Sequence, residues 1–184
     1  MKTISTINPE LTLVNPDPDR DTPFAIDWFA GEAGIRTLQL MGNADAEITT
    51  TSYEKEHQII EEFLDLEEAG QQLTWAVRYR DKTIGAVWIE LFDTAAIPAP
   101  AVSIMIGDVS VRGEGLGAAT VSSVLYYLKT ETRYTKAYAR HLLNNTASKK
   151  LLSQLGFVEF GEPYAEKNGL RFQNVVIDLA NLEV

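Results

Sequence analysis

The stretch from residue 101 to residue 118, AVSIMIGDVSVRGEGLGA, constrains this chain more than any other. It begins with the apolar run AVSIMI, which predicts a strand, and ends with Gly113, Gly115 and Gly117. The amphipathic residues 119–131 follow directly and predict a helix. Glycines let backbone amides approach a ligand closely, and the first turn of a helix has unpaired N–H groups. We therefore expect a phosphate-bearing ligand at this loop.

Three kinds of phosphate loop can be compared with this one. A Walker A loop requires GxxxxGK[ST], and the chain contains no such string. The dinucleotide pattern GxGxxG/A is met by Gly113, Gly115 and Ala118, but the strand that follows ends in amides where an acidic residue is needed. The pattern Arg-x-x-Gly-x-Gly is met by Arg112, Gly115 and Gly117. A glycine-rich helix start without any ligand is the structural alternative.

The third pattern is that of the pyrophosphate loop in the GNAT superfamily, the acetyl-CoA-dependent N-acyltransferases. The chain resembles this superfamily over residues 73–179, and most closely its RimJ/RimL-like branch of ribosomal-protein N-terminal acetyltransferases and their small-molecule relatives. A second block carries the resemblance: the residues 145–148, NTAS, then a short helix and Leu155-Gly156-Phe157. The resemblance implies an α/β (α+β) GNAT fold, a twisted mixed sheet of about seven strands and about four helices in the order βααβββαβαββ.

The residue patterns predict most of those elements directly. Residues 11–14 alternate as a short strand, and Thr22-Pro23 is expected to open a helix that Gly31 and Gly34 break. A second short helical piece can follow through Leu38, Leu40 and Met41. Thr51 and Glu54 have the spacing of a capping box for a helix that stops at Gly70. Further strands are expected at residues 73–80, 83–92, 136–143, 157–164 and 170–179.

Composition limits the classes of function. With 184 residues and 45% hydrophobic content, residues 1–184 are expected to form a single domain. The chain has no cysteine, which excludes disulfides, a thiolate nucleophile and thiolate-bound metal, and we expect no metal site. No apolar run approaches the roughly 18 residues of a membrane span, and no signal peptide is recognised, so a cytoplasmic protein without a membrane partner is expected. The net charge of −10 argues against nucleic acid as a partner.

The resemblance implies a set of acetyl-CoA contacts. Gly107-Asp108 interrupts an apolar strand where GNAT proteins carry a β-bulge, although Gly107 could also simply end the strand. Asn145 and Ser148 are expected to face the cofactor, and the alternative is that they cap the following helix. The expected cofactor-binding residues are Ile106, Gly107, Arg112, Gly113, Glu114, Gly115, Leu116, Gly117, Ala118, Asn145 and Ser148.

Acetyl transfer to an amine also needs groups that accept and donate protons. Many GNAT proteins carry a tyrosine as general acid where this chain has Leu152, which shifts the expectation to Ser148 or to an ordered water. Glu90 is a candidate base, in phase with Ile84, Ala86 and Trp88, or else a strand-end residue in solvent. His141 and Glu166 are further candidates, and a structural histidine is the alternative for His141.

We therefore expect an N-acetyltransferase that moves the acetyl group of acetyl-CoA to a primary amine by direct transfer. A small-molecule amine and a protein N-terminus are the acceptors that the resemblance implies. A non-catalytic acyl-CoA sensor of the same fold is the main alternative, and a nicotinamide or flavin oxidoreductase is a remote one. The sequence leaves the oligomeric state open, with a homodimer as one option.

Overall fold

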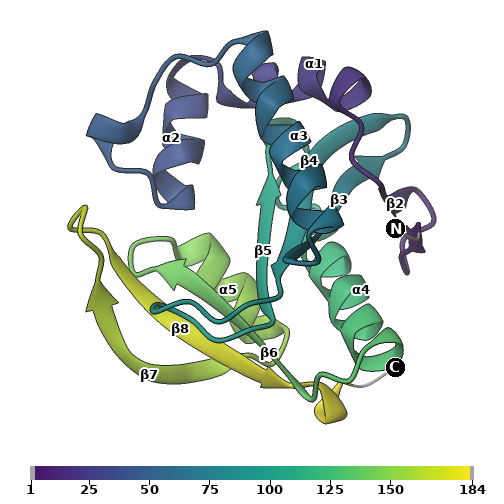
Figure 1. Ribbon diagram of the computed structural model, residues 1–184, viewed down its shortest axis with the longest axis vertical. Coiled ribbons are helices and arrows are strands. Elements are labelled where there is room, and N and C mark those ends of the chain that lie inside the picture. Colours follow the sequence, from purple (N-terminus) through teal and green to yellow (C-terminus); the bar gives the residue numbers. More distant parts are fainter. Residues whose placement is uncertain (1–2, 183–184) are drawn as a thin grey trace.

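In the computed structural model, which describes residues 3–182, one mixed sheet separates two layers of helices (Figure 1). Its strands lie side by side in the order β1-β2-β3-β4-β5-β6-β8-β7. The strands are β1 Ile4–Ser5, β2 Leu11–Val14, β3 Gln72–Tyr79, β4 Lys82–Glu90, β5 Ala101–Ile106, β6 Lys136–Leu142, β7 Val158–Ala165 and β8 Arg171–Asp178. The helices are α1 Pro18–Phe29, α2 Gly31–Met41, α3 Tyr53–Glu68, α4 Leu116–Glu131 and α5 Thr146–Gln154, with short 3₁₀ turns η1 Asp45–Glu47, η2 Val109–Val111 and η3 Leu179–Asn181.

The predicted α/β class and GNAT-like arrangement are confirmed, with two additions to the predicted element order. The described residues form eight strands rather than about seven, because the two-residue β1 pairs with β2 at the sheet edge. They form five α-helices rather than about four, because α2 is a full helix. Gly34 does not end a helix. A Cβ at Gly34 would lie 2.1 Å from the backbone carbon of Phe29, so glycine is needed where α2 turns sharply away from α1.

The predicted start of the first long helix is wrong by about one turn. α1 begins at Pro18, and the Asp17 carboxylate accepts a hydrogen bond of 3.0 Å from the Arg20 N–H. Asp17 and Pro18 are thus the N-cap and first helical residue that were expected at Thr22 and Pro23. Pro23 lies inside the helix on its exposed side, where its missing N–H leaves one carbonyl of the first turn to solvent.

The predicted capping box of the third helix is also wrong. Ser52, not Thr51, caps α3, and its hydroxyl accepts a bond of 3.2 Å from the Lys55 N–H. The Thr51 hydroxyl instead donates to Glu56 Oε1 at 2.5 Å. Gly70 does terminate the helix region as expected, with a φ of +68° that favours glycine. Thr51 is therefore committed to a side chain within the protein, which matters for the site below.

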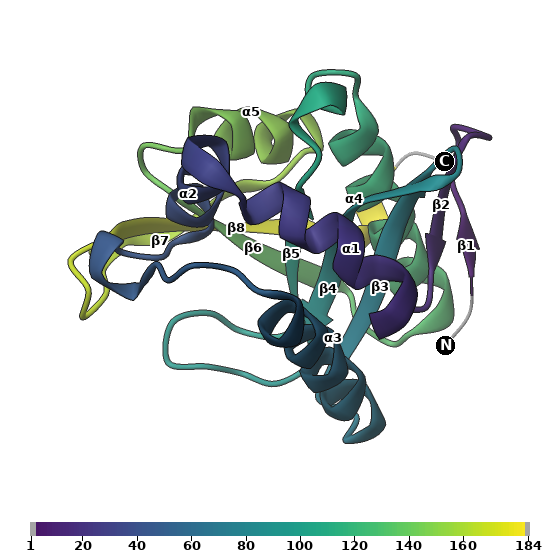
Figure 2. The same cartoon turned by 90° about the horizontal axis from the view of Figure 1, so that it is seen from above.

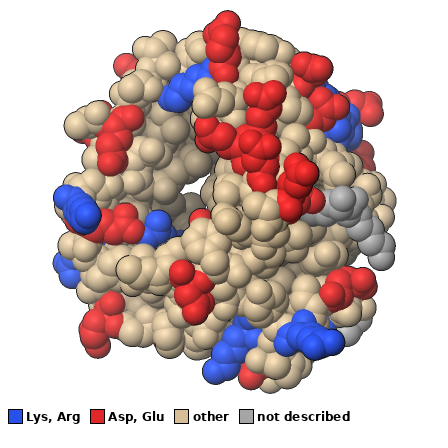
Figure 3. Space-filling model, in the orientation of Figure 1, with Lys and Arg blue, Asp and Glu red and all other residues tan. Residues whose placement is uncertain are grey.

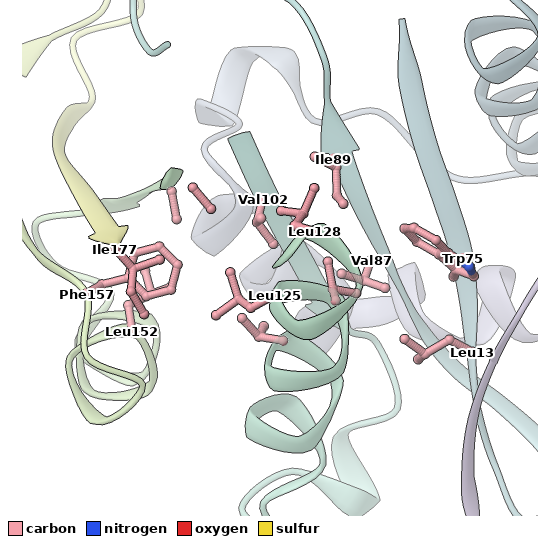
Figure 4. Packing of buried hydrophobic residues seen from close by; sticks show 14 of the residues in the cluster. Leu13, Trp75, Val87, Ile89, Val102, Leu125, Leu128, Leu152, Phe157 and Ile177 are labelled. Carbon is pink, nitrogen blue, oxygen red and sulfur yellow. The ribbon is translucent and has the colours of Figure 1, made fainter. Parts of the chain in front are cut away.

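Helices α4 and α5 cover one face of the sheet, and α1 and α3 cover the other (Figure 2). The main core lies between the sheet and α4, where Trp75, Val87 and Ile89 meet Leu125 and Leu128 (Figure 4). These five side chains are nearly or fully excluded from solvent. A fully buried Leu, Ile or Val contributes about 1.5–3 kcal/mol, so this contact fixes α4 on the central strands.

A β-bulge in β4 changes which side chains share a face. Val77 pairs with Gly85 while Arg78 pairs with Thr83, so Ile84 is an extra residue in β4. Ile84 packs into the main core beside α4, whereas Trp88 packs against Phe63 of α3. The expectation that Glu90 shares a face with Ile84 is therefore wrong. Glu90 does share a face with Trp88, two residues earlier in β4.

Candidate functional site

The sheet is split between its two central parallel strands. β5 and β6 are paired in register only at Ala101 and Tyr138, and beyond that pair they diverge toward Ile106 and Leu142 (Figure 1). The facing edges of diverging strands carry backbone donors and acceptors that can pair with an extended ligand. A deep hollow opens through the molecule in the same region (Figure 3). The split thus offers a passage between the two faces of the sheet.

The backbone at the end of β5 is interrupted as predicted. The amides of Gly107 and Asp108 both donate to the carbonyl of Ile84, at 2.8 and 3.0 Å. Two consecutive amides on one carbonyl are the hydrogen-bond pattern of a β-bulge, so Gly107 does more than end the strand. A Cβ on Gly107 would lie 2.2 Å from the ring of Trp28 in α1. Glycine is therefore required here for the contact between β5 and α1.

The glycine loop leads directly into α4. Gly113 and Gly115 have φ values of +88° and +80°, and Gly115 is the N-cap residue of α4 without any side-chain cap. Gly117 has no such backbone requirement, and the nearest atom to a Cβ at this position is 3.7 Å away on Leu151. The protein itself thus has room for a side chain at Gly117, and close approach of a ligand gives glycine a reason there. With the free amides of the first turn, this opening fits an anionic group such as a pyrophosphate.

Arg112 lies at this loop but bonds toward the protein. Its Nε donates to the Ile106 carbonyl at 2.8 Å, and its Nη2 donates to the hydroxyl of Thr37 in α2 at 3.0 Å. Partial burial lowers the pKa of the Arg112 guanidinium, an effect that the charge of Asp108 opposes. Arg112 therefore ties the loop to α2, and its predicted phosphate contact remains a prediction. Glu114 is exposed on the loop.

The start of α5 lies across the split from β5. Asn145 Oδ1 accepts a bond of 3.0 Å from the Ser148 N–H, and its Nδ2 donates to the Leu40 carbonyl of α2 at 3.1 Å. The alternative role of Asn145 as an N-cap is confirmed. The Ser148 hydroxyl is half-buried and has no hydrogen-bond partner within residues 3–182. Leu152 packs in the core beside Phe157 and Ile177, where a tyrosine acid would have to displace these contacts (Figure 4).

The other candidate proton carriers are not brought together. His141 is 4% exposed, and its Nδ1 lies 2.9 Å from the Leu142 carbonyl, which favours the structural alternative. Glu166 forms an ion pair with Arg140, whose guanidinium lies 4.5 Å from the centre of the Phe172 ring. Glu90 is half-buried at the last position of β4, opposite Ala101. Their catalytic roles remain predictions.

Helix α2 joins the two sides of the split, which the sequence did not indicate. Besides the bonds from Arg112 and Asn145, the Gly42 carbonyl at its C-terminal end accepts from Asn168 Nδ2 at 3.4 Å. Asn168 lies in the connection between β7 and β8. Three segments of the C-terminal half therefore hold the N-terminal helix α2 in place.

A cavity of about 440 Å³ lies on the α1 and α3 face of the sheet. Its wall is largely apolar and includes Trp28, Phe29, Ile59, Ile60, Phe63 and Trp88. Met105 of β5 also lines it, so the cavity reaches the strand that borders the split. An open groove of about 580 Å³ lies elsewhere, between α4 and the end of α5, and no residue of β5 lines it. None of the predicted site residues lines either cavity. We therefore take the smaller cavity as the candidate acceptor site.

The cavity contains two buried carboxyl groups that the sequence analysis missed. Asp21 of α1 is 4% exposed and Glu56 of α3 is 3% exposed. Helical spacing gave a usable signal, because Glu56 precedes Ile59, Ile60 and Phe63 by three, four and seven residues on one helix face. A carboxyl group on the apolar face of a helix is costly unless it is paired or used.

Among the described residues 3–182, no group of three or more His, Cys, Asp or Glu side chains could hold a metal ion. Over the same residues, no helix has both the length and the apolar character that crossing a membrane requires.

Comparisons with known proteins agree with this geometry. The model of the acetyltransferase (GNAT) domain matches residues 10–158. Among curated proteins, the uncharacterized protein MJ1062 of Methanocaldococcus jannaschii is 34% identical over 90 residues, which is 47% of this chain and 18% of that protein. The chain thus matches less than a fifth of the length of this relative.

Several solved structures share the fold at low sequence identity. RimJ of Mycobacterium smegmatis in complex with CoA-disulfide has a TM-score of 0.81 at 17% identity, covering 100% of this chain and 90% of RimJ. RimL, the ribosomal L7/L12 alpha-N-protein acetyltransferase in complex with coenzyme A, has a TM-score of 0.77 at 12% identity, with 96% and 98% covered. Spermidine N-acetyltransferase from Vibrio cholerae, in complex with CoA and spermine, has a TM-score of 0.71 at 17% identity, with 94% and 98% covered.

Proposed function

This chain belongs to the family of GNAT acetyltransferase domains, and we propose that it transfers the acetyl group of acetyl-CoA to a primary amine. The family model covers most of the chain, so the predicted superfamily is confirmed. The predicted likeness to the RimJ/RimL-like branch is confirmed at the level of the fold.

One observation carries the proposal. The split between β5 and β6 lies beside a glycine-lined helix start, and β5 also contributes Met105 to the wall of an apolar cavity on the α1 and α3 face. A phosphate-bearing donor and an amine acceptor need separate binding sites whose reacting ends come together. The two faces of the sheet beside the split offer such sites. The absence of a side chain at Gly117, where the protein has room for one, supports a ligand on the α4 side.

Acetyl-CoA supplies the acetyl group as an activated thioester. The amides at the start of α4 are expected to bind its pyrophosphate, and free backbone groups along β5 are expected to bind its extended pantetheine arm. In direct transfer the amine nitrogen forms a bond to the acetyl carbon as the carbon–sulfur bond breaks. One proton leaves the nitrogen and one reaches the sulfur, and the half-buried hydroxyl of Ser148 is our candidate for the second proton transfer.

The acceptor is an amine, and two structural neighbours illustrate its range. The RimL neighbour is described as an alpha-N-protein acetyltransferase of ribosomal L7/L12, and another neighbour acetylates spermidine. We propose direct transfer without a covalent acyl-enzyme, because the chain has no cysteine. Which amine this chain prefers depends on the cavity, considered below.

The test is acetylation of an amine panel by the purified protein. The panel contains apolar monoamines, spermidine and short peptides with a free N-terminus, and thiol release and product mass are both measured. We expect acetyl-CoA-dependent release of CoA and a mass increase of one acetyl group on at least one amine. Binding of acetyl-CoA without thiol release on any amine would favour the sensor alternative. Binding of a nicotinamide cofactor in place of CoA would overturn the proposal.

A further inference from the structure

The acceptor cavity contains one carboxyl group whose hydrogen-bonding capacity the fold leaves largely unused. We infer that Glu56 binds the ammonium group of the acceptor, and that the acceptor is a small primary amine with an apolar body. This inference rests on the proposed function, because it names the substrate class of the same site. Glu56 acts here as a binding and specificity residue.

The contacts of Glu56 show a carboxyl group that is fixed but only half satisfied. Its Oε1 accepts the bond of 2.5 Å from the Thr51 hydroxyl. Its Oε2 has no hydrogen-bond partner within residues 3–182, although Glu56 is 3% exposed and lines the cavity. A buried carboxylate normally accepts several bonds, and Glu56 Oε2 is not among the fully enclosed unpaired atoms, so an ammonium donor in the cavity can reach it.

The second buried carboxyl group, that of Asp21, provides the contrast. Asp21 accepts from the Arg20 guanidinium at 2.7 and 2.8 Å, from the Asp17 N–H at 2.9 Å and from the Thr83 hydroxyl at 2.7 Å. These bonds occupy both oxygens and fasten α1 to β4. Asp21 is thus used by the fold. Glu47, the third carboxyl group on the wall, is exposed, and its Oε2 accepts from the Ala44 N–H and from Asn168 Nδ2. Glu56 is therefore the buried carboxyl group that remains for a ligand.

The wall of the cavity defines the rest of the acceptor. Around Glu56 the wall is formed by Trp28, Ile59, Ile60, Phe63 and Trp88. A volume of about 440 Å³ suits a small molecule, and apolar walls favour a hydrocarbon or aromatic body over a polar one. With one buried carboxyl group left for a ligand, a monoamine fits this cavity better than a polyamine.

The electrostatics of the empty cavity agree with a site prepared for a cation. Burial raises the pKa of Glu56, while the Thr51 hydroxyl bond and the charge of Lys55 act in the opposite direction. The other charged groups on the cavity wall are Asp21 and Glu47. An ammonium ion would offset the desolvation of the Glu56 carboxylate, so binding and ionisation support each other.

The first experiment compares a matched pair of ligands. Binding of 2-phenylethylamine and of 2-phenylethanol is measured by calorimetry at pH 8 for the unsubstituted protein, Glu56→Gln and Glu62→Gln. Glu62 is exposed on the same helix and serves as the control. We expect the unsubstituted protein and Glu62→Gln to prefer the amine, and Glu56→Gln to bind the amine at least about tenfold more weakly while binding of the alcohol is retained. Equal binding of amine and alcohol by the unsubstituted protein would overturn the inference.

The second experiment separates binding from a structural role by melting temperature. The pKa of Glu56 is higher in the folded protein than in the unfolded chain. The protonated carboxyl group therefore stabilises the fold at low pH, and this contribution is lost as the pH rises through the folded pKa. We expect Glu56→Gln to melt at or above the temperature of the unsubstituted protein at pH 8, with a difference that shrinks as the pH falls toward 4.5. A lower melting temperature for Glu56→Gln at pH 8, with amine and alcohol binding reduced equally, would show a structural role and overturn the inference.

Acetylation rates distinguish this inference from the proposed function. If spermidine or a peptide N-terminus is acetylated with higher kcat/KM than 2-phenylethylamine, the inference is wrong and the acetyltransferase function stands. If no amine is acetylated although the ammonium preference depends on Glu56, the proposed function is wrong and the binding site stands.

Discussion

The two faces of the sheet form their parts of the site by different means. On the α4 and α5 face the site consists of backbone: positive φ at Gly113 and Gly115, an open position at Gly117 and the amides of a helix start. On the α1 and α3 face it consists of side chains, mostly apolar, with Glu56 as the buried carboxyl group proposed to bind the ligand. A backbone site demands particular residues at fixed spacings, while a cavity of side chains tolerates many combinations. This difference explains why the donor is recognisable in the sequence and the acceptor is not.

The largest effect is expected from a negative charge in the backbone site, because it should abolish binding of acetyl-CoA. Gly117→Glu introduces a carboxylate at the helix start, where a Cβ meets no atom closer than 3.7 Å and the added charge repels pyrophosphate. Acetyl-CoA at 100 times its Kd should raise the free energy of unfolding by about 2.7 kcal/mol. For a chain of this size, that raises the melting temperature by roughly 5–10 °C. We expect this shift to vanish in Gly117→Glu, measured by thermal denaturation.

A matched control is available on the same helix. Tyr126→Glu adds the same charge at an exposed position of α4 and should retain the shift with acetyl-CoA. Loss of the shift in both variants, or in neither, would mean that the cofactor does not bind at this loop.

Ser148→Ala tests a side chain of the α4 and α5 face that is a candidate for proton transfer. Since Asn145 caps α5 through the Ser148 backbone N–H, the substitution leaves the cap intact. If the hydroxyl donates the proton to the leaving sulfur, turnover should fall by about 10²–10⁴-fold while acetyl-CoA affinity and melting temperature stay constant. Steady-state kinetics at saturating acetyl-CoA measure this. Unchanged turnover would transfer the role to an ordered water.

Glu90→Gln tests a side chain of the other face. Glu90 shares the α3-facing side of β4 with Trp88, although it does not line the cavity itself. We predict a fall in kcat/KM of about tenfold or more and a change in the acidic limb of the pH–rate profile, as for loss of a general base. If both are unaffected, Glu90 is a strand-end residue and Glu56 is the next carboxyl group to examine.

The smallest effect is expected from the cap of α5. Asn145→Ala removes the bond to the Ser148 N–H and the bond to the Leu40 carbonyl. Loss of an N-cap costs about 1 kcal/mol, which is roughly 2–4 °C in melting temperature at this size. Urea denaturation should show this loss, and Asn145→Asp, which keeps the cap but not the bond to α2, should recover most of it. If Asn145→Asp is as unstable as Asn145→Ala, the contact with α2 dominates.

The features that the structure bears out depend on local sequence. The interruption at Gly107, the passage from glycine loop to helix, and the N-cap at Asn145, which was the alternative to a cofactor contact, each follow from a few adjacent residues. The predictions that failed depend on partners elsewhere. The Thr51 hydroxyl bonds to Glu56 and does not cap α3. Ile84 lies on the other face of the sheet from that predicted, because the register between β3 and β4 shifts beside it. The cavity was missed because α1, α3, β4 and β5 each supply a few of its side chains.

Arg112 shows a more subtle limit. The pattern that contains it identified a glycine loop that leads into α4, yet the bonds of Arg112 run to Ile106 and to Thr37, 75 residues away in the chain. An arginine beside a phosphate loop and an arginine that fastens a helix to that loop have the same local sequence. Only the position of α2 distinguishes them.

The bonds of α2 also bear on how the two substrates influence each other. α2 lines the cavity through Leu38 and Met41, and it is held by Arg112 of the glycine loop and by Asn145 of α5. A donor that orders the loop and α5 therefore also orders one wall of the acceptor cavity. Coupling of this kind is reciprocal. If the bound donor raises the affinity for the acceptor by some factor, an acceptor that contacts α2 raises the affinity for the donor by that same factor. In kinetic terms, the two substrates are expected to bind with positive cooperativity rather than independently.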